Sequence, residues 1–240
     1  MTLHINTSPN NHQLSEINSW LKNEFKKNGE GFLNNWNIIE SYFENGELII
    51  LIKDSKVIGF TTWKIYDDLI LIIDIVEIHP DYRKSGYGKF MMQETFKFCI
   101  SKGAKVVNLF CSPESSYSFW KSFGFLDMPK TAFCEPEFSL YKPLIEVQIP
   151  IEKNQLENEI IELWDCEPYQ SKDVSSKWIW AVKITSKKIS PPILIACSRD
   201  WNIRLSKNGE VIRETKVKYF SHKNPIDRGK FMFIDKLEYL

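Results

Sequence analysis

The sequence has no excess of charge of either sign. Its 240 residues include 31 basic and 31 acidic side chains, so the formal net charge at pH 7 is zero. A neutral chain has no global field that would draw it to nucleic acid, to an anionic membrane or to a highly charged substrate. Any charged ligand must be recognised by a local cluster of residues, and we do not expect nucleic acid as a partner.

Long hydrophobic runs and a leader segment are also missing. The first ten residues have no basic stretch followed by an apolar core, and the apolar run 69–73 ends at Asp74. A membrane-spanning helix needs about 20 apolar residues. We therefore expect no membrane contact and a cytoplasmic protein.

Cysteine and histidine are too few and too scattered for a disulfide framework or a metal site. The five cysteines form no C-x-x-C pair and are odd in number, which favours reduced thiols. The four histidines have no metal-ligand spacing with each other or with the cysteines. We expect no metal.

The length and composition favour two globular domains. Hydrophobic residues make up 43% of the chain and charged residues 26%, enough for a packed interior and a hydrated surface. Domains usually contain about 100–200 residues. The sequence pattern changes after Pro143, so we predict domains at residues 1–144 and 145–240.

The first predicted domain mixes helices and strands. Five apolar residues recur at helical spacing after Asn10, a typical helix cap, and a polar turn separates two β-rich runs. Further helices are predicted at 32–43, 87–101 and 115–123, and strands at 2–7, 47–53, 57–66, 69–78, 106–111 and within 131–144.

The second predicted domain is mostly β after a helix at 155–164. Asn208-Gly209 between apolar runs is a strong hairpin signal. Its aromatic residues would form either a small β core, the interpretation we favour, or a stacking platform for bases beside basic residues. The residues concerned are Trp178, Trp180, Trp201, Tyr219 and Phe220, with Arg199, Arg204, Lys216 and Lys218.

The most informative segment joins a predicted strand to a predicted helix, with the sequence IVEIHPDYRKSGYGKF. Gly86 and Gly88 let the main chain approach a bulky anion, and the helix that follows supplies unpaired N–H groups and the positive end of its dipole. Arg83, Lys84 and Lys89 add full positive charge. The segment predicts a pyrophosphate cradle.

Other phosphate loops fit this segment less well. There is no G-x-x-x-x-G-K-[S/T], and the G-x-G lacks the third glycine of a dinucleotide fingerprint. ATP and NAD sites are therefore not expected. A plain glycine turn with solvated basic residues stays open as an alternative, because such short strings also occur by chance.

Two motifs in order resemble those of the GNAT (GCN5-related) N-acetyltransferase superfamily. HPDYRKSGYG resembles the family's acetyl-CoA motif, and FWKSFGF at 119–125 resembles its later F-Y-x-x-x-G-F motif. The resemblance covers about residues 3–144. It implies an α/β (α+β) fold with a mixed, mostly antiparallel sheet flanked by helices, and a possible homodimer, but nothing about the β-rich second domain.

The resemblance also implies how acetyl-CoA is held as cosubstrate. The main chain of Val76, Glu77 and Ile78 would pair with the pantetheine arm like an added strand. The residues around the pyrophosphate would be Arg83, Lys84, Ser85, Gly86, Tyr87, Gly88 and Lys89.

The reaction that the resemblance implies is direct transfer of acetyl from the thioester to a primary amine, with the oxyanion held by the N–H of Ile78. Because an ammonium must first lose a proton, a carboxylate should act as general base. Glu77 is the first candidate and Asp74 the second. They lie three positions apart, on opposite faces of an ideal strand, and a solvent-facing Glu77 is an open alternative.

Two positions depart from the family pattern. Trp120 stands where many relatives have a tyrosine that protonates the departing thiolate, and Pro113 where relatives often have an asparagine that contacts the cofactor. Tyr117, on nearly the same helix face as Trp120, is the candidate acid in its place, although a structural role is also open. Two rival functions therefore remain: a catalytically weak acyl-CoA-binding regulatory module, and an acetyltransferase whose protein or RNA acceptor is read by the second domain.

Overall fold

The computed structural model describes residues 2–29, 31–66, 69–129, 137–152, 158–220 and 230–237. Two compact units make up the chain, Met1–Leu109 and Phe110–Leu240. This division falls inside residues 1–144, so a domain boundary at residue 144 stays a prediction.

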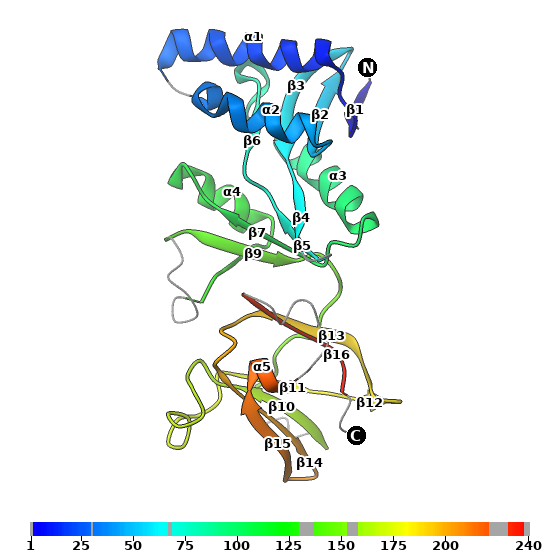
Figure 1. The fold of residues 1–240 in the computed structure, drawn as a ribbon, viewed down its shortest axis with the longest axis vertical. Coiled ribbons are helices and arrows are strands. Elements are labelled where there is room, and N and C mark those ends of the chain that lie inside the picture. Colours follow the sequence, from blue (N-terminus) through cyan, green and yellow to red (C-terminus); the bar gives the residue numbers. More distant parts are fainter. Residues whose placement is uncertain are drawn as a thin grey trace. The chain divides into compact units, whose positions relative to one another are not determined.

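The first unit has the expected mixture of helices and strands (Figure 1). Its strands are β1 (Leu3–Asn6), β2 (Leu48–Lys53), β3 (Lys56–Thr62), β4 (Lys64–Tyr66), β5 (Ile70–Ile72), β6 (Val76–Ile78) and β7 (Val106–Phe110). Its helices are α1 (Asn11–Asn28), α2 (Trp36–Glu44) and α3 (Tyr87–Ser101), with 3-10 turns at Phe32–Asn35 and Pro80–Tyr82.

Local signals explain where these elements begin and end. The side chain of Asn10 accepts a hydrogen bond from the N–H of Gln13 at 3.0 Å, and the Gln13 side chain accepts one from the N–H of Asn10, which together cap α1. Gly29, with φ of 69°, ends the helix. The β2–β3 hairpin turns at Asp54 and Ser55, where the polar turn was predicted.

The predicted strand at 69–78 is divided between two sheets. β5 pairs with β4 and, in parallel, with β7, whereas β6 lies at the edge of the antiparallel sheet β1-β2-β3-β6. Between them, the N–H of Ile75 donates to the side chain of Thr62 at 2.9 Å, so the ladder is interrupted. The division leaves one side of β6 without a partner strand among the described residues.

The faces of the β1-β2-β3-β6 sheet pack against different helices. Ile50, Ile52 and Phe60 belong to the core formed with α1 and α2, whereas Leu51 and Ile78 pack with residues of α3. Successive residues alternate between the faces, as a strand requires. Side chains of β6 therefore face either α1 or α3.

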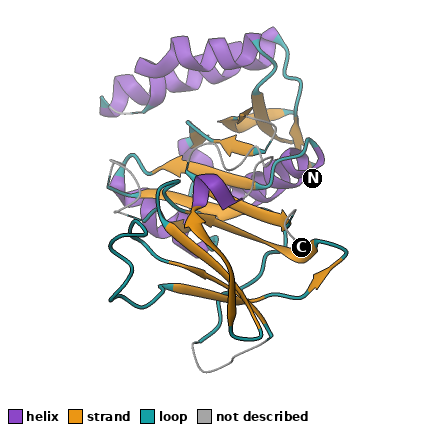
Figure 2. Cartoon of the chain, turned by 60° about the horizontal axis from the view of Figure 1, so that its bottom comes forward, coloured by secondary structure: helices purple, strands orange, loops and turns teal. Residues whose placement is uncertain are grey.

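The second unit begins with the short helix α4 (Tyr117–Ser122) and the hairpin of β8 (Leu126–Asp127) and β9 (Ser139–Pro143). Strands dominate the C-terminal region (Figure 2), and its sheets, β11-β10-β14-β15 and β12-β13-β16, are antiparallel. The strands are β10 (Glu159–Leu163), β11 (Trp178–Ala181), β12 (Ile184–Thr185), β13 (Lys188–Ala196), β14 (Asn202–Lys207), β15 (Glu210–Lys216) and β16 (Phe231–Lys236), with α5 at Val217–Phe220.

One element of this region was predicted wrongly. The helix expected at 155–164 is instead β10 over Glu159–Leu163, with Ile161 and Leu163 fully buried, and residues 155–157 lie outside the described ones. Burial at every second residue follows from pairing with β11 and β14 on either side.

The aromatic residues of this region build a core, as we favoured. Trp180, Trp201 and Phe220 are at most 3% exposed, and only Tyr219 of the five is mostly exposed. Lys216 and Lys218 pair with Asp200 at 3.2 and 2.7 Å. Because these rings are buried and both lysines are paired with a carboxylate, they do not form the alternative platform on which bases would stack.

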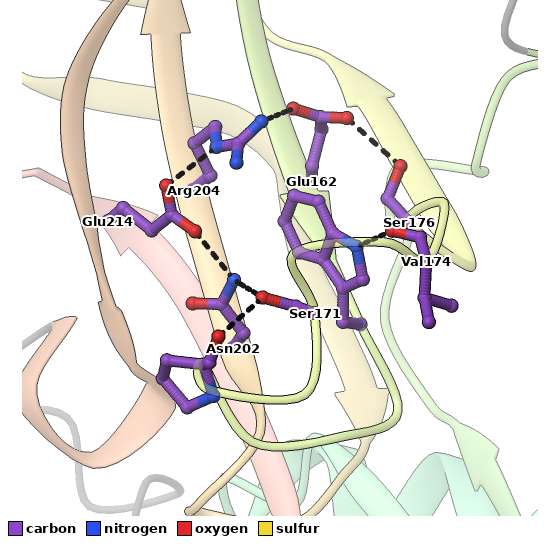
Figure 3. Close-up of polar contacts among 9 residues, drawn as sticks. Glu162, Ser171, Val174, Ser176, Asn202, Arg204 and Glu214 are labelled. Carbon is purple, nitrogen blue, oxygen red and sulfur yellow. Dashed lines mark hydrogen bonds and ion pairs between the residues drawn. The ribbon is translucent and has the colours of Figure 1, made fainter.

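A buried polar network fixes the segment between β10 and β11 onto the sheet (Figure 3). Asn202, fully buried on β14, donates from Nδ2 to Ser171 Oγ at 2.9 Å and to Glu214 Oε1 at 2.8 Å. The Ser171 hydroxyl in turn donates to the carbonyl of Pro168 at 2.9 Å. One amide thus joins the segment to two neighbouring strands.

The network continues across the outer face of the same sheet. Arg204 lies 3.0 Å from Glu214 and 3.6 Å from Glu162, and Ser176 donates to Glu162 at 2.9 Å. Trp164 Nε1 donates to the carbonyl of Val174 at 2.8 Å. These contacts hold both ends of the segment.

Replacing Asn202 by alanine should lower the free energy of unfolding by about 1–3 kcal/mol, because the change leaves the buried hydroxyl of Ser171 without its donor. Denaturant unfolding followed by tryptophan fluorescence measures the effect. Ser206→Ala, a half-buried change on the same strand, serves as control and should alter stability by less than about 0.5 kcal/mol. Equal losses in the two variants would show that the Asn202 network contributes nothing specific.

Candidate functional site

The loop between β6 and α3 presents an uncapped helix terminus. Lys84 and Gly86 have positive φ values of 59° and 82°, and a Cβ on Gly86 would meet no atom within 4 Å. The N–H of Phe90 donates to the carbonyl of Gly86 at 3.1 Å, and no side chain of the described residues caps the helix. The first-turn N–H groups of α3 are therefore directed at open space, as an anion site requires.

Positive charge gathers at this terminus from two parts of the sequence. Lys84 and Lys89 are exposed beside it, as expected. Lys53, at the end of β2, donates to the hydroxyl of Tyr87 at 2.7 Å, and this hydrogen bond raises the pKa of Lys53. Sequence reasoning missed Lys53, because its contact with Tyr87, the first residue of α3, joins residues far apart in the sequence.

The main-chain groups of Ile78 point away from β3, toward the side of β6 that has no partner strand among the described residues. The N–H of His79 donates to Ile58 O and the N–H of Thr62 to Ile75 O, both at 2.9 Å, so odd-numbered residues of this segment face β3. In an antiparallel pair the alternate residues point the other way. The N–H and C=O of Ile78 are therefore directed to the edge of the sheet.

Side chains of the same unit occupy these two groups. Glu77 Oε1 accepts from the N–H of Ile78 at 2.9 Å, and Arg83 Nε donates to the Ile78 carbonyl at 2.9 Å. Arg83 Nη2 lies 2.9 Å from Glu77 Oε1 and 2.6 Å from Glu24 Oε1. Arg83, expected beside the pyrophosphate, is here paired with two carboxylates.

The cluster of Glu24, Arg83 and Glu77 is largely withdrawn from water. The side chains of Glu24 and Glu77 are 4% and 15% exposed, so Glu77 does not face solvent. Burial raises the pKa of Glu77 above the ordinary value for a carboxyl, against the opposing effects of Arg83 and of the Ile78 N–H. A carboxylate with a raised pKa is a stronger base, which suits proton abstraction.

Asp74, the second candidate base, has a different setting. It is exposed in the link between β5 and β6, where it accepts a hydrogen bond from the hydroxyl of Tyr42. Burial, followed by this hydrogen bond, raises the pKa of Tyr42. Asp74 is thus exposed to solvent, whereas Glu77 is largely buried.

The two positions discussed for thiolate protonation lie in the second unit. Tyr117 donates its hydroxyl to Asp127 at 2.6 Å, and this hydrogen bond raises the pKa of Tyr117. Trp120 is 6% exposed and packs against Phe119 and Phe125, with ring centroids 5.0 and 5.2 Å away. Trp120 has a packing role, and Tyr117 keeps its proton at neutral pH.

No three His, Cys, Asp or Glu side chains among the described residues are grouped to hold a metal ion. No helix in that part of the chain is long and apolar enough to cross a membrane.

The chain is similar to known proteins over its first part. The sequence pattern of the Acetyltransferase (GNAT) family matches residues 13–125. No curated protein matches the chain significantly.

Several solved structures are similar to about 60% of this chain. Ard1 from Thermoplasma volcanium is 14% identical, with a TM-score of 0.47, over 61% of this chain and 100% of that one. The PaiA N-acetyltransferase from Thermoplasma acidophilum, solved in complex with coenzyme A, is 16% identical, with a TM-score of 0.46, over 59% of this chain and 97% of that one. GCN5 from Tetrahymena is 12% identical, with a TM-score of 0.46, over 60% and 97%.

Proposed function

We propose that this chain, whose residues 13–125 form a domain of the acetyltransferase (GNAT) family, transfers an acetyl group from acetyl-CoA to a primary amine. One observation carries the proposal: the open N-terminus of α3 at Gly86 and the buried carboxylate of Glu77 lie at the two ends of one short loop. The first suits a pyrophosphate, and the second suits a general base.

Acetyl-CoA fits the groups that the first unit presents. The first-turn N–H groups of α3, with Lys84, Lys89 and the added Lys53, would hold the pyrophosphate. The outward main chain of β6 would pair with the amides of the pantetheine arm. Arg83 must then release the carbonyl of Ile78, because the two compete for the same acceptor.

The proposed chemistry is proton transfer and electrostatic stabilisation by the chain. Glu77 would take a proton from the acceptor ammonium, and the amine nitrogen would then form a bond to the thioester carbon, giving a tetrahedral oxyanion. When this intermediate collapses, the C–S bond breaks, the thiolate leaves, and the nitrogen gives up its second proton to water. The N–H of Ile78, once released by Glu77, would stabilise the oxyanion. Tyr117 is the candidate that returns a proton to the departing thiolate, with water as the alternative donor.

A second function is supported by the packing of Trp120. Because the indole is buried among aromatic rings and cannot give up a proton, a chain that binds acyl-CoA and transfers acetyl slowly, as a regulatory module, fits the same site. Binding with negligible amide formation would favour this alternative. A role of residues 145–240 in recognising the acceptor, a macromolecular acceptor and a homodimer are further proposals.

Gly86→Glu should weaken acetyl-CoA and CoA binding at least about tenfold in a calorimetric titration, because it places a carboxylate where the helix terminus attracts an anion. Gly46→Glu is a matched control: Gly46 also has a positive φ, 70°, and open space around its Cβ position. A wild-type chain that fails to bind, or an equal loss in both variants, would contradict the phosphate cradle.

Glu77→Gln should lower the rate of amide formation by about 10²–10⁴. In the wild type, kcat/KM should fall as pH drops through the pKa of Glu77, which burial raises, so the acid limb should lie above the range of an ordinary carboxyl. The limb should vanish in Glu77→Gln and persist in Glu44→Gln, an exposed change on α2. An unaltered pH profile in Glu77→Gln would exclude Glu77 as the base.

A further inference from the structure

Glu24 is a buried carboxylate that the chemistry above does not use. It lies on α1 with its side chain only 4% exposed. Its Oε2 is buried and accepts no hydrogen bond from the described residues. Because burying a carboxylate with an unsatisfied oxygen is costly, Glu24 calls for a functional explanation.

One nitrogen atom makes both ion pairs of the cluster. Arg83 Nη2 lies 2.6 Å from Glu24 Oε1 and 2.9 Å from Glu77 Oε1. The same Glu77 oxygen accepts from the N–H of Ile78 at 2.9 Å. A cationic nitrogen is thus held between two carboxylates, next to the main-chain group proposed to stabilise the oxyanion.

We propose that Glu24 and Glu77 form the ammonium-binding site of the acceptor, and that Arg83 Nη2 fills this site while no acceptor is bound. The inference rests on the proposed function and names the residues that would bind the ammonium group of the acceptor. Such a group has three N–H donors, one more than Nη2, and the third matches the unpartnered Oε2 of Glu24.

Oε2 of Glu24 is buried, and Gly31 is its neighbour: a Cβ on Gly31 would lie 3.3 Å from this oxygen. Nη2 of Arg83 already contacts the same carboxylate at 2.6 Å. We therefore expect an ammonium to reach Glu24 by replacing Arg83.

Arg83 is suited to give way to a ligand. Its side chain is 39% exposed, and its main chain belongs to the loop that leads to the proposed phosphate cradle. A bound pyrophosphate would offer the guanidinium another anion. The two carboxylates would then be left unpaired and would favour the acceptor ammonium, so acetyl-CoA should bind before the amine.

The first experiment titrates the full chain carrying Arg83→Ala with n-propylammonium chloride, followed by calorimetry and by melting temperature. We expect binding and a raised melting temperature. Tetramethylammonium, which has no N–H donor, should have no such effect. The double variant Arg83→Ala/Glu24→Gln should bind propylammonium at least about tenfold more weakly, since it loses a charged hydrogen-bond acceptor.

Equal effects of the two ammonium ions, or undiminished binding in the double variant, would overturn the site. Should Arg83→Ala not fold, Arg83→Met keeps the length of the side chain and is titrated in the same way. Neither measurement involves acetyl-CoA. Propylammonium binding by a chain that does not bind CoA would therefore support this site and refute the proposed function, and the reverse result would refute the site alone.

The second experiment tests the displacement of Arg83 in the wild-type chain. CoA at saturation should raise the affinity for propylammonium by a factor of about 5–150, the usual range of coupling between two sites. The increase should be lost in Glu24→Gln and kept in Glu16→Gln, a change on the same helix whose carboxylate accepts from the N–H of Val57 at 3.0 Å. An affinity unchanged by CoA would overturn the displacement.

Discussion

The main chain of β6 pairs with β3 on one side only, and a strand with an open edge presents N–H and C=O groups that attract another extended chain. In this protein the open edge at Ile78 is occupied by Glu77 and Arg83. The N–H and C=O groups of Ile78 are therefore hydrogen-bonded without a further strand. In our proposal the amides of acetyl-CoA replace the two side chains as partners. The cosubstrate pairing, the general base and the acceptor site that we propose all depend on this arrangement.

The chain has no net charge, so the electrostatic field at the candidate site comes from the charged groups close to it. The N-terminus of α3 follows the loop after β6, and the carboxylate of Glu77 precedes that loop and pairs, with Glu24, to Arg83. Arg83 belongs to the loop itself. In our proposal its guanidinium moves between an anionic ligand and the two carboxylates, which would link the binding of cosubstrate to the binding of acceptor.

Sequence reasoning succeeded where the deciding signals are local. The cap of α1, the β2–β3 turn and the bounds of α3 each depend on a few adjacent residues, and all were predicted. It failed at Glu159–Leu163, whose apolar residues fit a helix as well as a strand until β11 and β14 pair with them. Tertiary structure alone decides such a segment.

Only part of the candidate site could be predicted from the sequence. The glycine loop and Glu77 follow from adjacent residues, whereas the pairing of Arg83 with Glu24 joins residues far apart in the sequence. One signal for Glu24 was available: it lies three residues after Leu21 and seven after Ile17, on the apolar face of α1, where a carboxylate is unexpected. No comparable signal marks Lys53.

The most direct test of acetyl transfer is to incubate the purified chain with acetyl-CoA labelled with ¹³C in the acetyl group and a set of simple primary amines, and to detect the labelled amide by NMR. The account predicts labelled amide and free CoA thiol in equal amounts. Thiol without amide would mean hydrolysis rather than transfer, and neither product despite CoA binding would contradict the enzyme and favour the regulatory module.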